Sequence, residues 1–290
     1  MISSIAAGLY AGIPEGTLYH YTTFRGLLGI VRGRTLWASD VRYMNDSAEL
    51  KHTADLIRLE VSQRIAAGHP RPELLNRFLD WVKHRITNGH MLFGASFRSN
   101  GNLLSQWRGY GGVGKGVSIG FDPDYVLRCA VEQDFQIGRC IYDRDEQQRL
   151  IGQIVDTVER QAERVDTSTD DTAADHRREF QAIESDLLRI AAVLKHPSFE
   201  EEQEWRLVSP VITDYLSAAV LFREGTSMLV PYVEFRFLPE HDRPICLQHM
   251  YLGPTAHDNI SMNSLQLFLG KHGVVPTHGI SYCEIPYRQY

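Results

Sequence analysis

Segments with the pattern of β-strands lie toward both ends of the chain, and two long helical inserts separate them. The strand patterns lie near residues 17–22, 35–39, 91–97, 116–121, 203–209, 217–223 and 227–235. Helical patterns occupy about residues 45–90 and 145–195. Because the early strands need the late ones to complete a sheet, the sequence predicts a single α+β domain over residues 1–290. We expect its core to consist of two small packed sheets around a cleft.

The first strand pattern is followed at once by a helix signal. Alternation in "TLYHYTT" places His20 and Thr22 on one face of a strand and Tyr21 on the other. Thr22 or Thr23 can cap the next helix, and Gly33 fits the position just after its end. The helical inserts carry similar signals. "NDSAEL" at residues 45–50 indicates a helix start, and "DTSTDDTAAD" indicates a loop between two helices.

Composition excludes several classes of protein. The net charge of −6 gives no global basic surface for duplex nucleic acid. The first residues lack a basic segment followed by an apolar core, and no apolar run is long enough to span a bilayer. The four cysteines form no CxxC pair, and the histidines form no HExxH motif, so no metal site is indicated. The sequence predicts a soluble, cytoplasmic protein without a membrane partner.

Three stretches carry more chemistry than a fold requires. His20 lies in a strand between two tyrosines, where it is either a packed ring or part of a ligand site. "SQWRGYGGVGKG" places Trp107, Arg108 and Tyr110 beside a run of glycines. These aromatic side chains can stack on a planar ligand, or they can plug the core below a tight loop. The loop is no Walker A motif, because Lys115 is followed by glycine.

The third stretch is "FEEEQEWRLVSP", in which an acidic run enters an apolar strand. Glu202 and Glu204 lie two residues apart, so in an extended chain they point to the same side. Acidic runs are usually solvated faces. Two carboxylates on one face are costly unless something is bound there, which favours a functional site over a solvated face.

Several of these stretches together resemble a bacterial family known only as a domain of unknown function (family twenty-nine seventy-one). The stretches are "LYHYTTFRGLLGIVRGRTLWASDVRYMNDSAEL", "SFRSNGNLLSQWRGYGGVGKGVSIGFD", "KHPSFEEEQEWRLV", "VPYVEF" and the final "YLGP…ISYCEIPYR". They occur in the family order over nearly the whole chain. This arrangement looks like the ADP-ribosyltransferase superfamily, which uses NAD to modify proteins or nucleic acids.

The resemblance implies a fold and a site. The fold would be an ADP-ribosyltransferase-like core, with His20 in its first strand and the pair Glu202 and Glu204 as the ExE or QxE signature of a later strand. The stacking aromatic is ambiguous between Trp37 and Tyr43. The residues expected to contact NAD are His20, Tyr21, Thr22, Trp37, Tyr43, Trp107, Arg108 and Tyr110. His20 would bind a ribose hydroxyl, and we expect it to face Glu204 across one cleft.

The leading functional hypothesis is therefore an NAD-dependent ADP-ribosyltransferase that acts on a macromolecular acceptor, either a protein or a nucleic acid. Glu204 would stabilise the oxocarbenium-like transition state, and Glu202 would orient or deprotonate the acceptor. NAD would be a substrate, and no metal is required. The resemblance further implies a toxin or phage-defence effector, with an antitoxin or a defence-system protein as partner. Two alternatives stay open: a non-catalytic sensor that binds a nucleotide or nucleic acid, and an NAD-independent nuclease.

Overall fold

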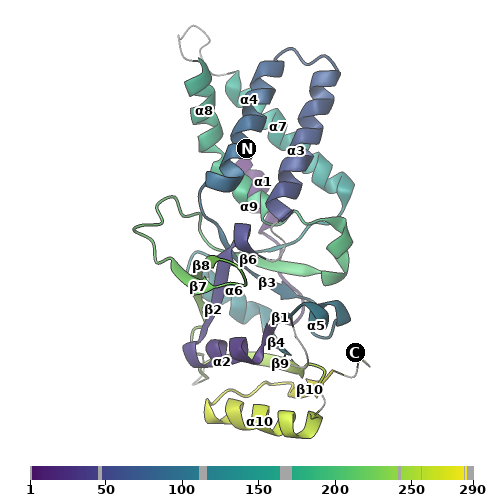
Figure 1. The fold of residues 1–290 in the computed structure, drawn as a ribbon, viewed down its shortest axis with the longest axis vertical. Helices are drawn as coiled ribbons and strands as arrows, with labels where there is room; N and C mark the ends of the chain where they lie inside the picture. Colours follow the sequence, from purple (N-terminus) through teal and green to yellow (C-terminus); the bar gives the residue numbers. More distant parts are fainter. Residues whose placement is uncertain are drawn as a thin grey trace.

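The computed structural model describes residues 2–44, 48–110, 116–163, 172–240, 243–255, 257–283 and 285. The chain forms a sheet lobe and a helical lobe, stacked along the long axis of the molecule (Figure 1). The helical inserts leave the sheet after one strand and return to it at another, so both lobes are built from segments distant in the sequence.

Among the described residues the strands form one ten-stranded sheet. Its main path runs in the order β10-β9-β4-β1-β3-β2-β8-β7, and β6 and β5 branch from β3. The strands are β1 (Leu18–Thr23), β2 (Thr35–Asp40), β3 (Phe93–Arg98), β4 (Gly116–Phe121), β5 (Gln136–Arg139), β6 (Glu204–Val208), β7 (Leu221–Glu224), β8 (Leu229–Arg236), β9 (Leu247–Leu252) and β10 (Ile280–Tyr282). The strands predicted near the start and the end of the chain therefore share one sheet. The expectation of two packed sheets is wrong, because β3 joins the two halves through hydrogen bonds.

The branch at β3 follows from its pairing register. One edge of β3 pairs with β6 along its whole length, from Gly94 to Arg98. The other edge is shared: β1 pairs at Arg98, and β2 pairs at Phe93 and Gly94. The middle of this second edge therefore lies between two diverging strands.

The sheet has two chemically different faces. Leu18, Phe97 and Ile119 lie on the face that we call the apolar face, and α2, α6 and α10 cover it with one continuous hydrophobic core. Tyr19 pairs with Arg98, and Arg98 pairs with Glu204, so these side chains lie on the opposite face, which we call the polar face. Alternation along each strand keeps the two sets apart.

The helices are α1 (Ile2–Leu9), α2 (Phe24–Gly33), η1 (Val41–Tyr43), α3 (Ala48–Ala66), α4 (Pro72–Asn88), α5 (Leu104–Tyr110), α6 (Pro123–Val131), α7 (Arg144–Ala162), α8 (Thr172–Ala182), α9 (Glu184–Ala191), η2 (Pro197–Glu202) and α10 (Asp258–Lys271). The helical lobe consists of α1, α3, α4, α7, α8 and α9, which share a second core. Ile57, Val61 and Phe78 are fully buried there, as their helical spacing predicts.

The local signals for α2 are largely confirmed. Thr23 is the N-cap, and its hydroxyl accepts a hydrogen bond from the amide of Gly26. At the other end Arg34, rather than Gly33, takes the left-handed conformation, with φ of 54°. The predicted cap of α3 at residues 45–47 and most of the predicted acidic loop lie outside the described residues. The elements α1, α6 and β5 were not predicted.

Candidate functional site

A cluster of buried charges lies on the polar face where β3 and β6 pair. We call Arg98, Lys195, Glu202, Glu204 and Arg206 the ion cluster. The register pairs Arg98 with Glu204, so their side chains leave the sheet on the same side. Arg206 follows two residues after Glu204 and shares that side. The strand pairing therefore assembles three of the five charges before any loop contributes.

Glu204 is fully buried and fully bonded. Its Oε1 accepts hydrogen bonds from Arg206 Nη2 at 2.7 Å and Nε at 2.9 Å, and from the hydroxyl of Ser96. Its Oε2 lies 2.6 Å from Lys195 Nζ and 3.3 Å from Arg98 Nη1. Both carboxylate oxygens are thus occupied by protein donors, and none of the side chain is exposed to solvent.

The surrounding charges decide the ionisation of Glu204. Burial alone raises the pKa of a carboxyl group, because the charged form loses its hydration. The charges of Arg206, Arg98 and Lys195 act in the opposite direction and hold the pKa of Glu204 well below its usual value. Glu204 is therefore a permanently ionised anchor for three cations.

Glu202 is the more accessible carboxylate of the pair. Its side chain is 12% exposed, and its Oε2 contacts Arg98 Nη2 at 2.7 Å and Lys195 Nζ at 2.7 Å. No described residue contacts its Oε1 through a hydrogen bond or ion pair. Glu202 is thus held by one oxygen and keeps the other available.

The segment after α9 closes the cluster from the side of the helical lobe. The main-chain N–H of Lys195 donates to the carbonyl of Ile141. The Lys195 carbonyl accepts a hydrogen bond from the side-chain amide of Gln147 at 2.7 Å. The Tyr142 hydroxyl accepts a hydrogen bond from the Glu204 amide at 2.9 Å. Arg206 Nη1 donates to the carbonyl of Ala192 at 2.8 Å. The ion cluster therefore links the two lobes.

His20 lies beside the cluster but on the other face. It pairs with Ile119 in the sheet and packs edge-on against Phe97, which are both apolar-face residues. Its Nδ1 lies 3.0 Å from the carbonyl oxygen of Ser96, whose hydroxyl reaches Glu204. The expectation that His20 and Glu204 face each other across one cleft is wrong. The two residues are joined through Ser96, because the register puts them on opposite faces.

The environment of His20 fixes its protonation. Burial lowers the pKa of His20 to about 4, the carbonyl of Ser96 partly opposes this, and the charge of Arg98 adds to the lowering. The ring is therefore neutral near pH 7. A carbonyl can only accept, so Nδ1 carries the proton and Nε2 keeps a lone pair.

The neighbours of His20 serve the packing of the strand. Tyr21 is buried on the polar face; its hydroxyl donates to the carbonyl of Asn100 and accepts from the amide of Leu103. Thr22 packs below α2, where its hydroxyl occupies the space that a side chain at Gly26 would need. Both residues were expected to contact NAD; in the structure the Tyr21 hydroxyl is occupied by main-chain groups, and Thr22 packs against α2.

The predicted aromatic loop splits into a core residue and a surface residue. Trp107 is 2% exposed; it packs edge-on against Tyr21, with ring centroids 4.9 Å apart, and its indole N–H donates to Asn102. Trp107 thus plugs the space between α5 and β1. Arg108 is exposed, and the side chain of Tyr110 lies outside the described residues.

Trp37 and Tyr43 are both exposed. Trp37 shares the polar face with Glu204, because its neighbour Ser39 pairs with Gly94 of β3. Its ring is 48% exposed and stacks on Tyr232, with centroids 4.5 Å apart. Tyr43 is 39% exposed and lies on η1, just after β2. Of the two, Trp37 has a ring positioned as a platform on the polar face.

Sequence reasoning missed most of the partners of Glu204. Ser96 and Arg98 come from β3, which is distant from Glu204 in the sequence, and Lys195 lies nine residues before Glu204. The clearest available signal was the lysine that ends the apolar run "LRIAAVLK", because a lysine there must find a buried anion. The described residues contain no group of three or more His, Cys, Asp or Glu suited to a metal ion. In the same residues, no helix has the length and apolar character needed to cross a membrane.

Comparison with known proteins gives one match. A family described as "Protein of unknown function (DUF2971)" matches residues 106–207. No curated protein and no solved structure matches the chain. The matched range begins just before Trp107 and includes Lys195, Glu202 at the end of η2 and Glu204 at the start of β6. The resemblance to this family is thus confirmed over residues 106–207, which contain every residue of the ion cluster but Arg98.

Proposed function

We propose that this protein is an NAD-dependent ADP-ribosyltransferase whose site lies on the polar face beside the ion cluster. The observation that carries the proposal is the state of Glu202. This carboxylate is oriented by Lys195 and Arg98 through one oxygen, while its other oxygen has no partner among the described residues. Cleavage of the bond between nicotinamide and ribose develops positive charge on the sugar, and a fixed carboxylate stabilises that charge.

The contacts favour a division of roles within the acidic pair. Glu204 has no exposed surface and no available oxygen, so it holds the cations in place. Glu202 is the one that can meet the substrate, through Oε1. The catalytic role that the resemblance implied for Glu204 is therefore assigned in this proposal to Glu202, with Glu204 as the positioning residue.

His20 acts in this proposal through Ser96. Its Nδ1–H fixes the Ser96 carbonyl, and the Ser96 hydroxyl donates to Glu204. The aromatic platform is Trp37, whose outer ring face is open to a planar group such as nicotinamide or adenine.

One observation favours a second candidate, a non-catalytic sensor that binds a nucleotide. In this candidate the saturated contacts of Glu204 serve binding alone. The leading proposal also includes an acceptor for the ADP-ribose, which is a protein or a nucleic acid. It further includes a role in toxicity or phage defence, together with a partner protein.

A single experiment separates these functions. The full chain is incubated with labelled NAD and cell lysate, and NAD consumption and labelled macromolecules are measured. We expect consumption, with a loss of roughly 10²-fold or more in Glu202→Gln. Glu201→Gln removes an exposed carboxylate from the same acidic run and should retain activity.

The other outcomes are equally informative. Binding of NAD by calorimetry without consumption, with any acceptor, supports the sensor. Cleavage of RNA without added NAD supports the nuclease alternative. Equal activity of wild type and folded Glu202→Gln contradicts the assignment of Glu202.

A further inference from the structure

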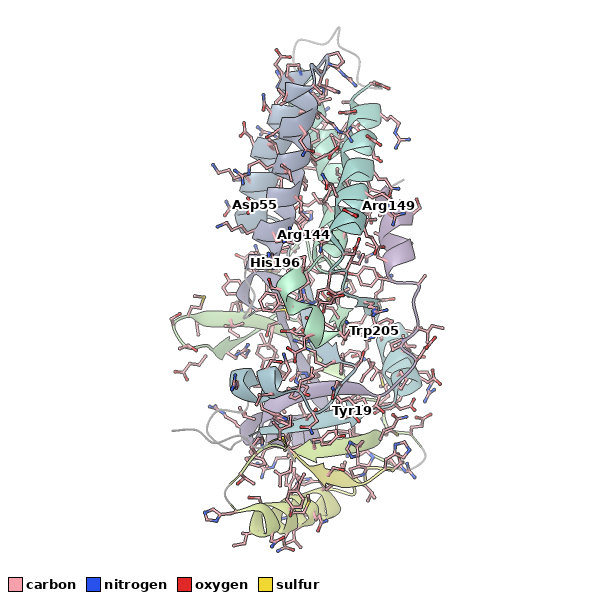
Figure 2. All side chains as sticks on the ribbon, turned by 90° about the vertical axis from the view of Figure 1, so that its right-hand side faces the viewer. Tyr19, Asp55, Arg144, Arg149, His196 and Trp205 are labelled. Atoms are coloured by element: carbon pink, nitrogen blue, oxygen red, sulfur yellow. The ribbon has the colours of Figure 1, made fainter. Side chains whose placement is uncertain are left out.

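A second group of reactive side chains lies on the polar face, on the far side of β1 from the ion cluster. Ser281 of β10 lies with its Oγ 3.0 Å from His249 Nε2, and His249 Nδ1 lies 3.3 Å from the Tyr19 hydroxyl. His249 pairs with Gly120 and therefore shares the face of Tyr19. Figure 2 labels Tyr19 among the strands below the helical lobe. A hydroxyl, an imidazole and a third group in sequence match the geometry of an activated nucleophile.

Two tautomers of the His249 ring fit its contacts. The Nδ1 atom lies 3.3 Å from the Tyr19 hydroxyl, which can donate or accept, and the Nε2 atom lies 3.0 Å from Ser281 Oγ. When Nδ1 carries the proton it donates to Tyr19, and this is the tautomer that a nucleophilic Ser281 requires.

In this tautomer His249 is a base toward Ser281. With the proton on Nδ1, Nε2 presents a lone pair to the hydroxyl of Ser281. Packing holds this arrangement in place: the Tyr19 ring fills the space above Gly101 and Gly120, where an added Cβ would lie within 3 Å of it. Tyr251 packs edge-on against the His249 ring at 4.5 Å.

The site is open enough for a substrate. Ser281, His249 and Tyr251 are all partly exposed, and β10 is the last strand on this side of the sheet among the described residues. Among the described residues, no acidic side chain is hydrogen-bonded to Ser281 or His249. The half-buried rings of Tyr19 and Tyr251 border the hydroxyl, which suits an uncharged substrate with an apolar group.

We propose that Ser281 is a nucleophile that His249 activates for acyl transfer from uncharged carboxylic esters. The Ser281 oxygen forms a bond to the acyl carbon as its proton passes to His249 Nε2. The bond from the acyl carbon to the ester oxygen breaks, and the alcohol leaves with that proton. Water, activated by the same nitrogen, then releases the carboxylic acid and restores the hydroxyl. Tyr19 is a positioning residue, because it touches His249 and not the substrate.

The test uses the full chain and two probes. A fluorophosphonate reagent should label one residue, located by peptide mass spectrometry at Ser281, and p-nitrophenyl acetate should be hydrolysed. Ser281→Ala should abolish both signals, and His249→Asn should slow labelling by roughly 10²-fold or more. Ser264→Ala, which removes an exposed hydroxyl on α10, should leave both unchanged.

A spectroscopic measurement keeps the proposal testable even if a variant unfolds. The ¹⁵N chemical shifts of wild-type His249 should report a protonated Nδ1 and an unprotonated Nε2. Tyr19→Phe, which keeps the ring, should shift the tautomer equilibrium and slow labelling. A proton on Nε2 in the wild type, labelling at another residue, or full labelling in folded His249→Asn would overturn the proposal.

Discussion

Replacing Glu204 by glutamine tests the central claim about the ion cluster. The substitution keeps the shape of the side chain but removes the negative charge that Lys195, Arg98 and Arg206 contact. Removing one partner from a buried ion pair typically costs about 3–5 kcal/mol, because the remaining charges stay buried without compensation. Since Glu204 is fully buried, no discount for solvent screening applies. We expect a decrease of that size in the free energy of unfolding, or a drop in melting temperature of roughly 6–20 °C.

The pH dependence of stability gives the same prediction an independent check. The pKa of Glu204 is lowered in the folded state from a reference value of 4.5. A group with a lowered folded pKa stabilises the fold fully above its unfolded pKa, and this contribution is lost as the pH falls toward the folded value. Wild-type stability should therefore decline below about pH 4.5, and Glu204→Gln should show a weaker decline.

The assay is urea unfolding followed by circular dichroism at pH 7 and at several lower pH values. Glu201→Gln serves as control, since its side chain is exposed and a surface change should alter stability by no more than about 0.5 kcal/mol. A loss below about 1 kcal/mol in Glu204→Gln would refute the reasoning, because it would mean that the cations are not held by this carboxylate.

Three further predictions concern the surroundings of the site. An NMR titration of His20 should give a pKa near 4, and a pKa near 6.5 would contradict the burial argument. The stability of the wild type should decrease as the pH falls from 6.5 toward 4, because the unfolded ring binds a proton that the folded ring excludes. Gly120→Ala should destabilise by about 1–3 kcal/mol in thermal melts, since the added methyl group meets the Tyr19 ring, whereas Gly109→Ala, where nothing lies near, should be neutral or stabilising. Trp107→Phe should lower the free energy of unfolding by about 1–3 kcal/mol through lost packing and a lost hydrogen bond, and an unchanged value would show that Trp107 is not a plug.

The sequence by itself determined the local elements. The alternation in β1 and the cap of α2 at Thr23 depend on neighbours within a few residues, so the pattern was sufficient. The spacing of Ile57 and Val61 likewise identified the buried side of α3. The extended chain expected between Glu202 and Glu204 is wrong, because Glu202 ends η2 and Gln203 takes the left-handed conformation with φ of 42°. The two carboxylates nevertheless meet at Lys195.

Only the tertiary structure decided what these residues meet. The pairing of Tyr19 with Arg98 placed His20 on the apolar face and Glu204 on the polar face. Register depends on hydrogen bonds between strands that are distant in the sequence, and a shift of one residue exchanges the faces. Lys195 lies only nine residues before Glu204, and the turn of η2 between them brings its amine to the carboxylate. Local patterns therefore fix which side chains share a strand face, and long-range pairing fixes which of those faces become a site.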